Sequence, residues 1–127
     1  MGKIVAVDFD GVLHDYSSGW RGVDVIPDGE VPGAIGWLRK LIEDPEILVK
    51  IFSTRNHQPG AIGAMQNWLL DHGLPSDQTI ELDFPLTKPP AHVLIDDRAM
   101  TFNGTFPRLD QIKNFQPWHK RGVFPGA

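Results

Sequence analysis

The chain has 127 residues, of which 41% are hydrophobic and 22% charged, and it contains no Cys. This length predicts a single domain over 1–127 whose core is large enough to fold without disulfides. The lack of Cys excludes zinc–thiolate sites and leaves His and carboxylate groups as candidate metal ligands. The formal net charge of −4 does not favour a general nucleic-acid-binding protein, although residues 1–87 hold 6 basic and 13 acidic groups and residues 88–127 hold 6 and 3.

Apolar runs such as residues 4–7 and 47–49 fall far below the roughly 18 residues that a membrane span requires. The first run begins close to Met1, without the apolar segment and small-residue cleavage site of a signal peptide. We therefore expect a cytoplasmic protein without membrane contact.

The first half of the chain alternates between strand-like and helix-like patterns. Residues 3–8 form a short apolar run that ends in an acid, and residues 47–52 form a second mostly apolar run, as is typical of buried parallel strands. Between them, apolar residues recur at three- and four-residue spacing over 34–42. This spacing predicts a helix that begins after Pro32 and ends before Pro45.

The second half continues this alternation with shorter elements. Apolar spacing over residues 62–69, after Pro59, predicts a second helix. Strands are predicted over 78–82 and 92–95, and a short final helix over 108–115.

This order predicts an α/β fold with a three-layer, open, mostly parallel sheet of the Rossmann-like kind. Ligands of such sheets bind at the carboxyl ends of the strands. The polar residues that follow the predicted strands or precede the next one are therefore the candidate site: Asp8, Asp10, Ser53, Thr54, Arg55, Lys88, Asp96 and Asp97.

Two acid pairs follow two of the predicted strands. The alternating spacing lets Asp8 and Asp10 converge on one site while Phe9 points away. Together with Asp96 and Asp97, these carboxylates would repel each other unless a cation lies among them, and Mg²⁺ suits a site made only of oxygen ligands. Either pair taken alone would be more typical of solvated residues at a strand end.

Two hydroxyl residues and two basic residues accompany the acids. Ser53, Thr54 and Arg55 follow a strand and precede a helix, where hydroxyl and backbone N–H groups can bind the oxygens of a phosphate. Lys88 lies in a segment stiffened by Pro89 and Pro90 and can neutralise a second side of the same anion.

These motifs resemble those of a known family. Asp-Phe-Asp-Gly-Val-Leu at 8–13, Ile-Phe-Ser-Thr-Arg at 51–55, Lys88, and Leu-Ile-Asp-Asp-Arg-Ala at 94–99 are similar, in this order, to the four motifs of the haloacid dehalogenase (HAD) superfamily of phosphatases. The resemblance covers residues 3–99 and implies a HAD-like hydrolase domain. The two acids of the first motif resemble the phosphatase branch of the superfamily.

The resemblance implies a magnesium-dependent phosphatase. Asp8 would be the nucleophile that forms an aspartyl-phosphate, and Asp10 would protonate the leaving alcohol and then activate water. Mg²⁺ would be held by Asp8, by the backbone carbonyl of Asp10 and by Asp96, with Asp97 as an outer or water-mediated ligand. Which of the two adjacent acids is the inner ligand stays open.

The remaining motif residues would bind the substrate. Ser53 and Lys88 would hold the phosphoryl oxygens, together with the neighbouring Thr54, and Arg55 would extend that contact or bind the body of the substrate.

The chain has no room for the cap domain of larger members of the superfamily. Only a short flap over residues 14–32 would lie beside an open site, in which Trp20 is either a substrate contact or a loop anchor. An open site favours a large phosphorylated substrate, such as a nucleotide or a nucleic-acid end of the kind used by the similar polynucleotide 3′-phosphatase domains, or a second subunit as lid in a homodimer. The tail over 117–127 includes a basic, aromatic stretch at 118–121 that could contact nucleic acid, although such a stretch is more often a docked or frayed terminus.

Three other functions share some of these features. A receiver-type phosphoacceptor domain has its acid pair first and its Lys last, an order that this chain does not follow. A non-catalytic HAD-like phosphate-binding module and a phosphotransferase or mutase of the same superfamily remain as alternatives.

Overall fold

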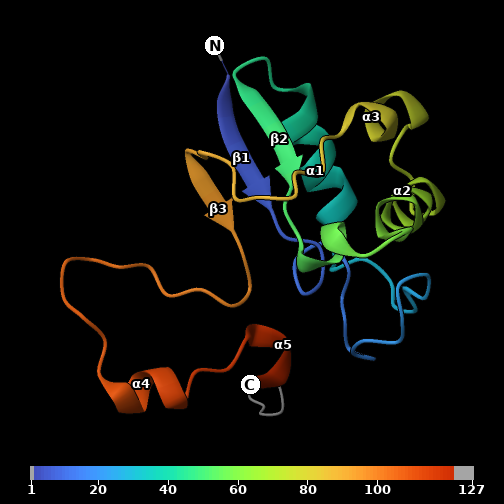
Figure 1. The fold of residues 1–127 in the computed structure, drawn as a ribbon. Helices are drawn as coiled ribbons and strands as arrows, with labels where there is room; N and C mark the ends of the chain where they lie inside the picture. Colours follow the sequence, from blue (N-terminus) through green and yellow to red (C-terminus); the bar gives the residue numbers. More distant parts are fainter. Residues whose placement is uncertain (1, 122–127) are drawn as a thin grey trace.

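The computed structural model of the chain describes residues 2–121. Three strands, β1 Lys3–Val7, β2 Ile47–Ile51 and β3 Val93–Ile95, form one parallel sheet in the order β2–β1–β3 (Figure 1). Val5 of β1 pairs with Val49 on one side and with Val93 on the other. The predicted small α/β fold with an open parallel sheet is confirmed, and these three strands lie where the sequence predicts them.

Two longer helices follow the first two strands. Helix α1 spans Ala34–Glu43 and helix α2 spans Ala61–Asp71, close to the predicted ranges. Each begins after a glycine with positive φ, Gly33 at 85° and Gly60 at 81°, a backbone conformation that costs other residues more. The shorter elements are the 3₁₀ helix η1 Thr54–His57 and the helices α3 Ser76–Glu81, α4 Leu109–Lys113 and α5 Trp118–Arg121.

The predicted strand over 78–82 is wrong, because this segment belongs to helix α3. The hydroxyl of Thr79 donates to the carbonyl of Pro75 at 2.9 Å, a local bond typical of a helical turn. The chain reaches the sheet only afterwards, at Asp83, which forms an isolated parallel bridge with Lys50. The β-branched residues of 78–82 favoured a strand, but the local bonds after Pro75 favour a helix.

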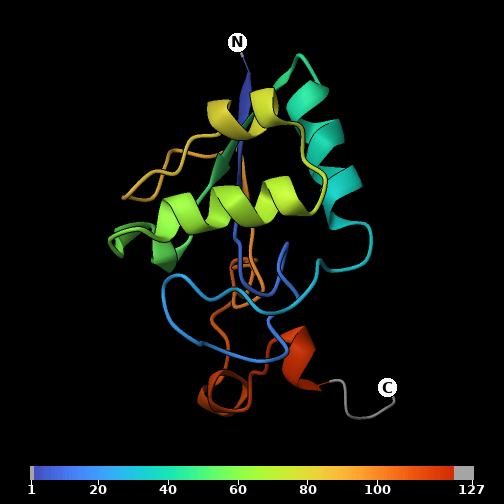
Figure 2. The same cartoon turned by 90° about the vertical axis from the view of Figure 1, so that its right-hand side faces the viewer.

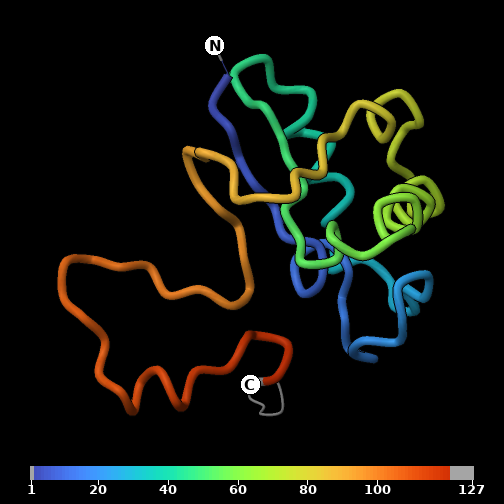
Figure 3. Tube along the Cα trace, in the orientation of Figure 1, coloured from blue at the N-terminus to red at the C-terminus, as the bar shows by residue number. Residues whose placement is uncertain are grey.

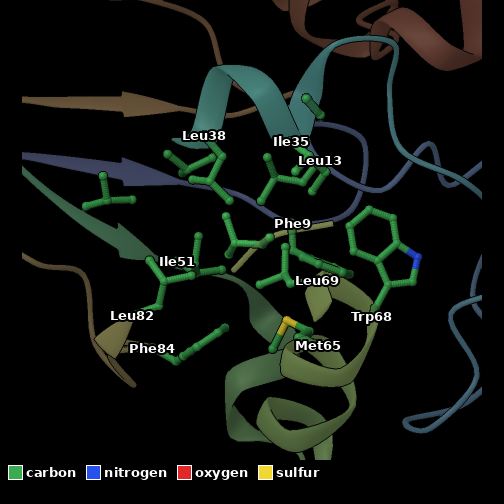
Figure 4. Packing of buried hydrophobic residues seen from close by; sticks show 14 of the residues in the cluster. Phe9, Leu13, Ile35, Leu38, Ile51, Met65, Trp68, Leu69, Leu82 and Phe84 are labelled. Atoms are coloured by element: carbon green, nitrogen blue, oxygen red, sulfur yellow. The ribbon is translucent and has the colours of Figure 1, made fainter. Parts of the chain in front are cut away.

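The core lies between the sheet and helices α1 and α2. Buried residues from β1 and β2, such as Val7 and Ile51, pack with Leu38 of α1 and Met65 of α2 (Figure 4). Phe9, just after β1, is fully buried in the same cluster, as the alternation of the first motif predicts.

The other face of the sheet is only partly covered within residues 2–121. Leu48 and Leu94 on this face are 52% and 41% exposed. Figure 2 shows the sheet nearly edge-on, with α1 on one side and the extended segment 84–92 on the other. The expected third layer is therefore wrong for the described residues. Pro85, Pro89 and Pro90 disfavour a helix in the segment that lies on this side of the sheet.

After β3 the chain leaves the sheet in a wide arc that contains α4 and returns with α5 to the loop after β1 (Figures 1 and 3). The predicted final helix over 108–115 is present in the shorter form of α4. Residues 122–127 of the predicted tail lie outside the described residues. Within residues 2–121, no helix combines the length and the apolar character needed to cross a bilayer.

Candidate active site

The loop after β1 brings the first motif to the end of β3. The backbone N–H of Asp8 donates to the carbonyl of Ile95 at 2.9 Å, and Gly11, with φ of 83°, permits the tight turn that follows. A Cβ at Gly11 would overlap the carboxylate of Asp97 and lie 3.0 Å from His119 Nε2. Glycine at this position therefore allows the loop to approach the segment that follows β3.

Three carboxylates converge at this edge of the sheet. Each of Asp8, Asp96 and Asp97 offers an oxygen, and these atoms lie within 4.8 Å of one another. Burial, followed by the hydrogen bond with Asp97 and the charge of Asp96, raises the pKa of Asp8 to about 8. This all-oxygen donor set fits Mg²⁺, because a divalent cation would remove the repulsion that favours a proton on Asp8.

Asp10 does not share this cluster. Its carboxylate accepts hydrogen bonds from His14 Nδ1 at 2.8 Å and from Arg55 Nε at 2.6 Å. Burial raises the pKa of Asp10, but these two hydrogen bonds outweigh it, so the pKa lies below its ordinary value. The Asp10 side chain is thus placed as an oriented carboxylate outside the group of candidate metal ligands.

The tautomer of His14 follows from its partners. The backbone N–H of Asp28, in the flap, donates to His14 Nε2 at 3.1 Å, so the neutral ring carries its proton on Nδ1 and donates it to Asp10. The imidazole is fully buried. The flap therefore holds Asp10 in place through His14, a role that the motifs of the sequence do not indicate.

Arg55 does not lie at the predicted phosphate-binding position on the cavity wall. Its side chain is 1% exposed, pairs with Asp10 and does not line the cavity next to Asp8. The guanidinium carbon lies 4.6 Å from the centre of the Trp20 ring and 5.8 Å from that of Phe9. Trp20, which is 48% exposed, thus packs on the Arg55 guanidinium, and Arg55 acts on the site through Asp10.

Ser53 lies at the predicted place, at the end of β2 and the start of η1. It is buried, and its Oγ accepts a hydrogen bond from the backbone N–H of Arg55 at 3.1 Å. A hydroxyl that accepts one hydrogen bond still has its own proton to donate, for example to a phosphoryl oxygen. The neighbouring Thr54 also lines the cavity.

Lys88 does not lie beside Ser53 and Thr54 at the cavity, where the sequence predicts that it binds phosphate. It is exposed in the segment 84–92 and is not among the residues that line the cavity. The basic side chains at the cavity wall are instead Arg98 and His57. The sequence offered one signal for Arg98, its position directly after the acid pair of the last motif.

The cavity at this edge of the sheet has a volume of about 420 Å³. Its lining comes from the ends of all three strands, from η1 and from the flap, and consists of Asp8, Asp10, Tyr16, Phe52, Ser53, Thr54, His57, Asp96, Asp97 and Arg98. Tyr16 of the flap has a positive φ of 65°, which is uncommon for a bulky residue and often marks a functional site. The cavity thus combines acids, hydroxyl groups, basic side chains and aromatic rings.

Comparison of the chain with protein-family models, with curated proteins and with solved structures gives no match. A functional assignment therefore depends on the residues of this chain and on the geometry of its cavity.

Proposed function

We propose that the protein is a magnesium-dependent phosphomonoester hydrolase that works through an aspartyl-phosphate on Asp8. One observation carries the proposal: Asp8, Asp96, Asp97 and Ser53 surround a single cavity at the carboxyl ends of three parallel strands. Three acids would repel an anionic substrate unless a cation is bound among them. The same cavity supplies hydroxyl and basic groups that can bind a phosphate.

Mg²⁺ would be held by Asp8, Asp96 and Asp97, which offer one oxygen each. When bound, it would neutralise the acids and withdraw charge from the phosphoryl group. Ser53 and Arg98 lie on the wall of the same cavity and would bind phosphoryl oxygens that face away from the acids.

The residues of the chain account for both steps of hydrolysis. A carboxylate oxygen of Asp8 would attack phosphorus and form a new O–P bond, while the bond between phosphorus and the ester oxygen breaks and the alcohol leaves with a proton from Asp10. Asp10 would then take a proton from water, which attacks the aspartyl-phosphate and releases inorganic phosphate and free Asp8. The hydrogen bonds from His14 and Arg55 favour the ionised form of Asp10 that this second step needs. The first step needs Asp10 to carry a proton, which the same hydrogen bonds disfavour in the free protein.

Purified protein is expected to release phosphate from a generic aryl phosphate when Mg²⁺ is present and to stop when a chelator is added. A panel of nucleotides, sugar phosphates and phosphorylated DNA or RNA ends then identifies the substrate class. Absence of magnesium-dependent release from every member of the panel would overturn the proposal.

Mg²⁺ is also expected to raise the melting temperature, because it binds the folded state and relieves the crowding of the acids. Asp96→Asn should remove this rise. The matched control is Asp77→Asn, which neutralises an exposed acid in the first turn of α3 and should retain it. A rise of the same size in Asp96→Asn would show that the cation binds elsewhere.

Gly11→Ala tests the close approach of the first motif to Asp97. The new Cβ would displace the Asp97 carboxylate, so we expect the affinity for Mg²⁺, measured by the melting-temperature rise, to fall about 10- to 100-fold. Gly60→Ala is the control, because Gly60 has a similar φ of +81° but a Cβ added there would meet no atom within 4 Å. An equal loss in both variants would mean that backbone strain, and not contact with Asp97, is the cause.

A further inference from the structure

Helix α5 contacts the candidate site although Trp118 lies 107 positions after Gly11 in the chain. The indole Nε1 of Trp118 donates to the Gly11 carbonyl at 2.6 Å. The next residue, His119, forms a hydrogen bond between its Nε2 and Asp97 Oδ2 at 2.8 Å. The end of the described chain therefore binds both loops that carry the candidate metal ligands.

The contact between His119 and Asp97 is well shielded from solvent. The two side chains are 5% and 4% exposed. The His119 ring meets the Tyr16 ring edge to face at 6.0 Å between centres, and the Trp118 ring in the same way at 5.6 Å. A hydrogen bond that water cannot reach, with its donor ring held on two sides, restricts the rotation of the Asp97 carboxylate.

The direction of this hydrogen bond follows from its acceptor. An ionised carboxylate can only accept, so His119 Nε2 carries the proton and Nδ1 is the other ring nitrogen. The bond occupies Oδ2 of Asp97 and leaves Oδ1 with one preferred orientation. Side chains that orient a metal ligand in this way raise metal affinity, and their removal typically lowers that affinity about 10- to 100-fold.

Helix α5 depends on the site as well. A helix of four residues is far too short to be stable alone. The arc that precedes it exposes most of its large apolar side chains, namely Met100, Phe102, Phe106, Leu109 and Ile112. The hydrogen bonds to Gly11 and Asp97, together with the ring contact between His119 and Tyr16, therefore help to anchor α5.

We infer that His119 is a positioning residue of the cation site, which orients Asp97 through its Nε2–H, while Trp118 holds the loop at Gly11 against the same helix. The inference rests on the proposed function, since it assigns a purpose to the orientation of Asp97. The site is then assembled from both ends of the chain, and α5 is a part of it.

The test uses full-length protein and measures the Mg²⁺ concentration that gives half of the maximal rise in melting temperature. His119→Ala is expected to raise this concentration about 10- to 100-fold. His119→Gln, whose amide can donate in place of Nε2–H, should restore much of the affinity. The control is His72→Ala, which removes a histidine bonded to the Trp68 carbonyl at 2.7 Å, away from the cavity, and should leave the affinity unchanged.

Trp118→Phe gives a second test that leaves His119 in place. It keeps an aromatic ring and deletes the donor to Gly11, and we expect weaker Mg²⁺ binding here as well. Unchanged affinity in both His119→Ala and Trp118→Phe would overturn the inference while the cation site stands. Absence of any Mg²⁺ effect in the unmodified protein would overturn the proposed function, and with it the inference.

Discussion

Asp8→Asn is expected to abolish turnover and to stabilise the metal-free protein. Loss of the nucleophile should lower kcat by at least about 10³-fold. The gain in stability has an electrostatic origin, because burial raises the pKa of Asp8 to about 8, with contributions from Asp97 and Asp96. Asn removes the titrating group, and we expect the free energy of unfolding at neutral pH to increase by on the order of 1–3 kcal/mol.

The pH dependence of this gain has a definite sign. Between the ordinary aspartate pKa of 3.8 and the folded-state pKa of about 8, the folded protein keeps a proton on Asp8 that the unfolded chain releases. The stability contributed by this group therefore falls as the pH rises through that range, and Asp8→Asn should flatten the fall. Thermal unfolding in the presence of a chelator, from acid to mildly alkaline pH, measures how the stability of each protein changes with pH. Asp77→Asn is the control. A variant that is less stable than the parent at neutral pH would contradict the crowding of the three acids.

Arg55→Ala is expected to be the most destabilising single change near the site. It removes one partner of a buried ion pair and leaves the Asp10 carboxylate with a single side-chain donor, His14. Loss of one partner of such a pair typically costs about 3–5 kcal/mol. The contacts of the guanidinium with the rings of Phe9 and Trp20 are lost as well.

Unfolding in urea measures this cost, and Arg39→Ala is the matched control. Arg39 pairs with Glu43 at 3.6 Å on the exposed side of α1, and a surface pair contributes at most about 1 kcal/mol. Similar losses in the two variants would show that the pair between Arg55 and Asp10 adds little to stability. Arg55→Lys separates charge from geometry, because Lys keeps the charge but lacks the planar guanidinium that contacts the two rings.

The positions of β1, β2 and β3 and the convergence of Asp8 with Asp96 and Asp97 could be predicted from short-range patterns. The strand β1 is apolar over nearly its whole length because a central parallel strand is buried along most of its course, and an acid after such a run lies at the carboxyl end of the sheet. Asp8, Asp96 and Asp97 lie together for this reason, and their proximity can be predicted without knowledge of any tertiary side-chain contact.

The partners of the basic residues could not be predicted in this way. Arg55 and Lys88 both have a side chain suited to phosphate, but the fold buries the first against Asp10 and leaves the second exposed. Arg55 is buried by a tertiary ion pair, and Lys88 is exposed because of the path of a proline-rich segment; neither cause can be recognised from neighbouring residues in the sequence. The role of His119 could not be predicted for the same reason, since its partner Asp97 lies 22 positions earlier, before an irregular arc.

In the proposed mechanism, Asp8 carries the phosphoryl group during turnover. Protein mixed with a phosphomonoester and Mg²⁺, quenched in acid within the first turnover and digested, allows mass spectrometry of the peptide that contains Asp8. We expect a phosphorylated Asp8 that disappears as inorganic phosphate is released and that never forms in Asp8→Asn. Turnover by Asp8→Asn at the rate of the unmodified protein would contradict this role of Asp8.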